Sequence, residues 1–99
     1  MGMERTVEFA DGVPAWAELR RRWDAAALTV EMRMIDGQLA LPGEEPADDW
    51  GEVRVGLPAG MVTLRRAPSG ISFVIWGNSD EAMLAEWERL MAASGEPAG

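Results

Sequence analysis

The chain of 99 residues contains no histidine, cysteine, lysine or tyrosine. These residue types supply most catalytic bases and nucleophiles, and histidine and cysteine are also common ligands of transition metals. The chain has four serines, but no histidine or lysine is available to activate a serine hydroxyl. The absence of cysteine also excludes a disulfide framework. We therefore expect a protein that is not an enzyme and that holds neither a metal nor a cofactor.

Basic residues are also scarce: nine face seventeen acidic residues, which gives a formal net charge of -8. An acidic surface repels phosphate backbones and anionic lipid headgroups, so we expect neither nucleic acid nor a membrane as partner. A protein partner of basic character, or a second copy of the chain in a homodimer, is favoured instead. All nine cations are arginine and fifteen residues are alanine. This composition is typical of a GC-rich genome and indicates a bacterial source.

Long apolar runs are missing as well. The longest stretch without charge runs from Ala67 to Ser79 and is shorter than the roughly 20 residues that cross a bilayer. The N-terminal segment Met1–Arg5 lacks the apolar centre of a signal peptide, and we therefore expect a cytoplasmic protein. The length suits one domain over residues 1–99. Its ordered core is predicted over approximately residues 4–94, with a frayed tail over 95–99.

Alternating apolar and polar residues predict three consecutive β-hairpins, of which the first has the clearest turn. Asp36-Gly37 is a favoured sequence for a two-residue type I′ turn. This turn sets Met34 opposite Leu39 and Met32 opposite Leu41, and all four should lie on the buried face of the sheet. The turn sequence and the apolar pattern thus agree on one register.

The next two hairpins are predicted to have their loops at Ala59-Gly60 and Ser69-Gly70. Arg66 is the one polar residue on the apolar face of the last hairpin. We therefore expect strand pairing to be weakest around Arg66 or at a bulge near Pro68. The predicted pairs are Leu57 with Val62, Val55 with Leu64, Leu64 with Ile75, and Arg66 with Phe73.

Two helices are predicted to frame these strands. The first opens at Pro14, and the second is capped by Asn78 or Ser79 and stops at Gly95. Each helix has an apolar stripe at spacings of three and four residues, which predicts that this stripe is buried. The stripes comprise Trp16, Leu19, Trp23, Ala26 and Ala27 in the first helix and Met83, Leu84, Trp87, Leu90 and Met91 in the second.

A short strand over residues 4–10 completes the order of strand, helix, about five strands and helix. This order predicts an α+β fold: a two-layer sandwich in which an antiparallel meander of five to six strands packs the N-terminal and C-terminal helices on one face. Because nearly every strand is apolar on one side only, the other face should be open to water. The methionines are expected to fill the core, namely Met32, Met34, Met61, Met83 and Met91.

The segment 44–52 contains five carboxylates and Trp50 within nine residues. Closely spaced oxygen ligands can hold Ca²⁺ or Mg²⁺, which makes a metal-assisted hydrolase at this acidic loop one alternative. However, the ligand spacing of an EF-hand is absent, and Pro46 fixes the middle of the segment. We interpret the segment as a solvated connection with Trp50 packed on the core, and docking on a basic partner is a further alternative.

The outward residues of the sheet supply the functional hypothesis. Trp76 and Val74 lie on a strand that is apolar on both faces, and Arg33, Arg54 and Arg65 also point outward. Tryptophan and arginine are enriched where protein interfaces concentrate their binding energy. We therefore predict a non-catalytic, acidic protein–protein interaction module, of the regulator, chaperone or immunity type, that binds through the open face. An alternative is a small-molecule binder with a pocket lined by methionine and tryptophan between helices and sheet.

Overall fold

The structure is a computed structural model that describes residues 3–76 and 80–97. It confirms the predicted α+β class. Within these described residues, neither helix is long and apolar enough to span a membrane. The elements are β1 (Met3–Glu8), α1 (Trp16–Ala25), β2 (Glu31–Ile35), β3 (Gln38–Leu39), β4 (Glu52–Leu57), β5 (Gly60–Ala67), β6 (Gly70–Ile75), α2 (Glu81–Ser94) and β7 (Glu96–Pro97).

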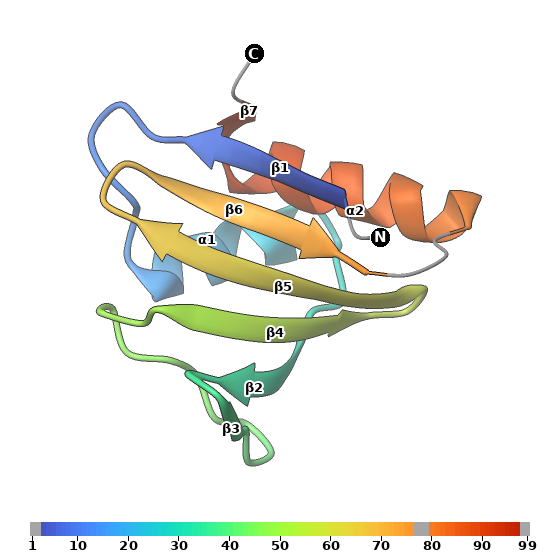
Figure 1. Ribbon diagram of the computed structural model, residues 1–99, viewed down its shortest axis with the longest axis horizontal. Helices are drawn as coiled ribbons and strands as arrows, with labels where there is room; N and C mark the ends of the chain where they lie inside the picture. Colours follow the sequence, from blue (N-terminus) through green and yellow to red (C-terminus); the bar gives the residue numbers. More distant parts are fainter. Residues whose placement is uncertain (1–2, 77–79, 98–99) are drawn as a thin grey trace.

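The strands form one antiparallel sheet in the order β3-β2-β4-β5-β6-β1-β7. The meander is observed for β4, β5 and β6. In contrast, β1 returns from the N-terminus to lie beside β6, and β3 lies outside β2 rather than next to β4. Figure 1 shows α1 and α2 behind the sheet, whose front carries no helix of the described chain. One face of the sheet is therefore covered and the other is open.

Residues 95–97 belong to the predicted frayed tail but lie along the sheet, whereas residues 98 and 99 of that tail lie outside the described residues. Gly95 ends α2 as expected, but Glu96 and Pro97 then form β7 and pair with Glu8 and Val7 of β1. The absence of a side chain at Gly95 permits this, because a Cβ there would lie 2.6 Å from Cε1 of Phe9. The chain can thus pass from the helix directly onto the edge of β1.

The predicted registers of the second and third hairpins are wrong by two residues. Leu57 pairs with Gly60 and Leu64 pairs with Phe73, so the loops are Pro58-Ala59 and Pro68-Ser69. Proline presets the backbone for the first position of a turn and donates no ladder hydrogen bond, which explains its place in both loops. Because a shift of two residues preserves the alternation, every strand residue keeps its predicted face.

The first hairpin has its predicted turn, since Asp36 and Gly37 adopt φ angles of 49° and 85° and Met34 pairs with Leu39. Its predicted burial is wrong, because Leu39 is 81% exposed. The β2–β4 pairing shifts register between Met32 and Met34. As a result, Met34 pairs with Arg54 and lies on the opposite face of the sheet from Met32. Such bulges bend a strand and redirect its side chains.

The predicted pair of Met32 and Leu41 does not form, because β3 ends at Leu39. One further backbone hydrogen bond joins the two arms, from the Ala40 nitrogen to the Arg33 oxygen at 3.0 Å. The arms then diverge at Pro42, which has no N–H to donate. Leu41 is consequently 71% exposed rather than buried.

The helices pack their apolar stripes on the inward residues of the strands in one core. Stripe residues Trp16, Leu19 and Trp23 of α1 are buried as predicted, whereas Ala27 follows the helix in an exposed position with φ 58°. In α2, Asp80 is the N-cap and accepts a hydrogen bond from the Met83 nitrogen at 2.8 Å. The predicted caps, Asn78 and Ser79, lie outside the described residues.

A buried polar contact locks the two helices together. The indole nitrogen of Trp23 donates to Ser94 Oγ at 2.8 Å, and this hydroxyl donates to the Leu90 oxygen at 2.7 Å. Two arginines cap the opposite helix: Arg22 donates to the Ser94 oxygen at 2.6 Å, and Arg89 donates to the Ala26 oxygen at 3.0 Å. Cations beside helix C-termini also interact favourably with the helix dipole.

Candidate interaction surface

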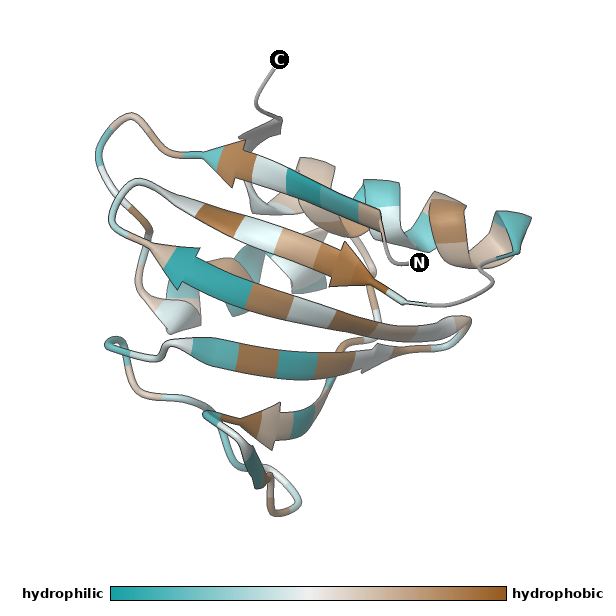
Figure 2. Ribbon diagram, in the orientation of Figure 1, coloured by the Kyte–Doolittle hydropathy of each residue, from teal (hydrophilic) through white to brown (hydrophobic). Residues whose placement is uncertain are grey.

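The open side of the sheet, here called the outer face, is built from alternate residues of β1, β6, β5, β4 and β2. Figure 2 shows the alternation of hydrophilic and hydrophobic residues along β4 and β5. The pairings arrange the outer face in rows across the strands. One row is Glu4, Val74, Thr63 and Arg54, and the next is Thr6, Ser72, Arg65 and Glu52.

A third row contains two exposed apolar residues of the outer face. Trp76 follows β6 directly and is 60% exposed, and Met61 on the neighbouring β5 is 52% exposed. Both residues line a small hollow of about 160 Å³ together with Asp80 and Met83. The prediction that Met61 fills the core is therefore wrong, although the inward position of Val62 already indicated that Met61 points outward.

Not every predicted contact residue reaches the surface. Val74 lies on the outer face but is only 4% exposed, and its neighbour Thr63 is 2% exposed. The Thr63 hydroxyl is buried and has no hydrogen-bond partner among the described residues. Short side chains thus form a low central area of the outer face, here called the floor, and the longer side chains around them project further into solvent.

The three predicted arginines stand on this floor in different environments. Arg33 lies over Gly56, where a Cβ would come within 2.8 Å of its Nε, and its guanidinium is 3.2 Å from Glu31. Arg65 lies 3.7 Å from Glu52. For Arg54, no ion pair is found among residues 3–76 and 80–97. Arg54 is therefore the member of the set whose charge is open to an outside carboxylate.

The acidic loop, residues 44–52, is tied to α1. The Asp48 carboxylate accepts a hydrogen bond from the Trp16 backbone nitrogen at 3.1 Å and so caps the helix, since Ala15 has no side-chain oxygen for this purpose. Glu45 accepts from the Trp16 indole at 3.1 Å and from Arg20 at 2.7 Å. Within the described residues, no three acidic side chains gather where they could hold a metal ion.

Trp50 is packed on the core as predicted, with 1% of its surface exposed. Its ring lies edge-on to Trp16 at 5.5 Å, and Trp16 lies edge-on to Trp23 at 5.2 Å. Arg66, the predicted mismatch, donates to the Trp50 oxygen at 2.5 Å and lies 6.0 Å from the centre of the Trp50 ring. These contacts assign structural roles to Arg66 and to three of the five tryptophans.

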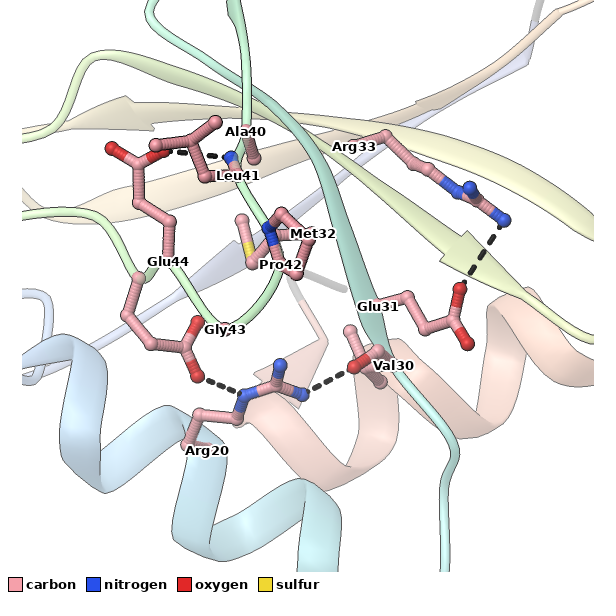
Figure 3. A pocket seen from close by; sticks show the side chains of 11 residues that line it. Arg20, Val30, Glu31, Met32, Arg33, Ala40, Leu41, Pro42, Gly43 and Glu44 are labelled. Carbon is pink, nitrogen blue, oxygen red and sulfur yellow. Dashed lines mark hydrogen bonds and ion pairs between the residues drawn. The ribbon is translucent and has the colours of Figure 1, made fainter.

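A cleft of about 480 Å³ opens where the arms of the first hairpin diverge. Figure 3 shows Met32 between the two arms and Arg20 at the mouth, where Arg20 donates to the Val30 oxygen at 2.6 Å. The cations of the cleft already face carboxylates of the same chain, Glu45 for Arg20 and Glu31 for Arg33. No tryptophan lines this cleft. It therefore differs from the pocket lined by methionine and tryptophan that the sequence predicts between helices and sheet.

The fold and the outer face together define a small α+β domain with one covered and one open side of its sheet. No known protein family, no curated protein and no solved structure matches this chain. The geometry of the outer face is therefore the basis for assigning a function.

Proposed function

We propose that the protein is a non-catalytic interaction module that binds a protein partner through the outer face. The main support is that Trp76 is 60% exposed and the neighbouring Met61 is 52% exposed. Both lie on a side of the sheet that no described element covers. Neighbouring large apolar residues on an exposed protein surface often mark interaction sites. Tryptophan is among the residue types most enriched in binding hot spots.

The construction of the outer face supports this role. Val74, Thr63 and Gly56 form a floor with short side chains, and this floor lies on strands that are fully paired on both sides. A surface built on central strands is rigid, so little conformational entropy is lost when a partner binds. Binding through such a surface requires no histidine, cysteine, lysine or tyrosine, the residue types that the chain lacks.

Position-specific crosslinking in cells tests the proposal. A photoreactive amino acid placed at Met61, with Trp76 intact, should yield a covalent protein adduct on irradiation. The adduct should be lost when Trp76→Ala is added. The same photoreactive group at Ala85, an exposed position of α2 on the covered side, is the matched control and should give no adduct.

Two results would overturn the proposal. One is the absence of any adduct at position 61, and the other is an adduct that Trp76→Ala leaves unchanged. Circular dichroism of the Trp76→Ala protein checks that the fold is retained, which we expect because an exposed side chain contributes little to the packed core.

A further inference from the structure

We infer that the partner of the outer face is a second copy of this chain, which stacks face to face with the first. The twofold axis runs parallel to the strands and lies between β5 and β6. This inference rests on the proposed function and specifies its partner. It is carried by the order of side chains in the three rows, which is complementary to itself under this rotation.

The central row shows the complementarity most clearly. From β1 to β4 it reads Glu4, Val74, Thr63 and Arg54. A twofold axis between β5 and β6 reverses this order in the second copy, so Glu4 of each chain faces Arg54 of the other. Val74 and Thr63, both short and already buried, face each other across the axis and allow close approach. Arg54, which has no ion pair among the described residues, thereby gains a carboxylate.

The other two rows obey the same rule. Trp76 belongs to the β6 side and Met61 to the β5 side, so each indole faces the methionine of the other copy, and both exposed apolar groups are covered. In the remaining row Ser72 faces Arg65, and hydroxyl and guanidinium groups are compatible hydrogen-bond partners. No row places like charges opposite each other.

The distribution of charge favours a second copy over a basic partner. The outer face holds four acidic and three basic side chains, namely Glu4, Glu8, Glu31, Glu52, Arg33, Arg54 and Arg65. The rest of the chain has thirteen acidic and six basic residues. The outer face is therefore the nearly neutral part of an acidic protein. An equally acidic molecule meets the least repulsion there, whereas a basic partner would be drawn elsewhere.

The size of the face predicts a modest affinity. The four strands that overlap, β1, β6, β5 and β4, have about 4.8 Å spacing and about 20 Å length and give a footprint of roughly 380 Å² before the height of the side chains is counted. Stable interfaces commonly bury about 800 Å² per partner, so this contact is smaller than a standard interface and belongs with weak, transient contacts. We expect a dissociation constant on the order of 1–100 μM, which requires measurement over a wide concentration range.

Sedimentation equilibrium of charge-exchanged variants tests the geometry. The wild-type chain should pass from monomer to dimer within the stated range. Glu4→Arg and Arg54→Glu should each weaken the dimer by about tenfold or more, because each creates two contacts between like charges. The double variant Glu4→Arg/Arg54→Glu should recover most of the lost affinity. Glu88→Arg, the same charge change at an exposed position of α2, should leave the dimer unchanged.

A second measurement reports which side chains face each other. Because the chain has no native cysteine, Met61→Cys and Trp76→Cys proteins can be mixed and treated with a bis-maleimide that spans the ~10 Å between stacked sheets. The mixture should give more crosslinked dimer than either variant alone, and replacement of the Met61→Cys protein by Ala85→Cys should remove this excess.

The outcomes separate this inference from the proposed function. A wild-type chain that stays monomeric up to millimolar concentration overturns the second copy as partner. So does a dimer that the single charge reversals do not weaken, or that the double variant does not restore. If the cellular adduct at position 61 then contains a different protein and still depends on Trp76, the proposed function stands without the dimer. If there is no adduct either, both fail.

Discussion

The two faces of the sheet consist of alternate residues of the same strands, yet they differ in almost every physical property. On the inner face, Val53, Leu64 and Phe73 are completely buried against the helices. On the outer face, the neighbours of these residues are Glu52, Arg65 and Ser72, and none of the three is buried. Proximity in sequence thus says nothing about environment, because the pleat sends successive side chains to opposite sides.

The tryptophans show what this difference means for function. Trp16, Trp23, Trp50 and Trp87 are at most 3% exposed and pack in the core, whereas Trp76 is 60% exposed. A tryptophan on the inner face stabilises the fold. A tryptophan on the outer face leaves apolar surface in water, and a partner that covered the ring would remove this cost.

The largest expected contrast comes from truncating one residue on each face. Phe73→Ala removes a ring from the fully buried core and should lower the free energy of unfolding by about 3–5 kcal/mol. Met61→Ala removes a side chain that is 52% exposed and should cost less than about 1 kcal/mol in the monomer. Urea unfolding at low protein concentration measures both. Equal losses would mean that the outer face is part of the folding core.

Features of the fold that depend on residues close together in the sequence were predictable, and those that depend on distant residues were not. The α+β class, the faces of β4, β5 and β6, and the Asp36-Gly37 turn follow from local alternation and turn chemistry, and the structure confirms them. The predicted registers at Pro58 and Pro68 are wrong because Gly60 and Gly70, although glycine favours turns, begin β5 and β6, and the prolines occupy the loops. The rule that proline is excluded from central strand positions would have corrected both.

Local sequence patterns could not predict the corner at the end of β2, where Leu39 is exposed, or the contacts of the acidic loop. The bulge next to Arg33 turns Met34 and Leu39 outward, but nothing in the alternation of β2 marks where a ladder will slip. Likewise, Asp48 caps a helix that begins more than thirty positions earlier. Such contacts appear only once the chain is folded, so a dense run of carboxylates cannot by itself be read as a metal site or as a solvated loop.

The next largest contrast concerns polar groups rather than apolar ones. Ser94→Ala leaves the buried indole nitrogen of Trp23 without its acceptor and should lower the free energy of unfolding by about 1–3 kcal/mol. Ser69→Ala, in the exposed turn after β5, is the matched control and should change it by less than about 0.5 kcal/mol. If Ser94→Ala is neutral, the contact between the helices contributes only through packing, not through its hydrogen bond.

The smallest predicted effect lies at the corner where β2 changes face, and it depends on pH. Asp36 accepts hydrogen bonds from the backbone nitrogens of Glu52 at 3.0 Å and Gly51 at 2.8 Å. These bonds favour the charged form and lower the pKa of Asp36 below its ordinary value. Since the pKa is lower in the folded state, the resulting stability is complete above the pKa of the unfolded chain and is lost as the pH falls through the folded pKa.

Asp36→Asn should therefore be less stable than the wild-type chain at pH 7, because a neutral amide is a weaker acceptor for the two backbone donors. The gap between the two proteins should narrow as the pH is lowered from about 5 toward 2, since only the wild-type chain loses its carboxylate there. Urea midpoints at several pH values measure the gap. A gap that stays constant down to pH 2 would show that the charge of Asp36 does not hold the hairpin against β4. In that case the turn alone would fix the corner, and the exposed residues Leu39 and Leu41 would depend on backbone geometry and not on this anchor.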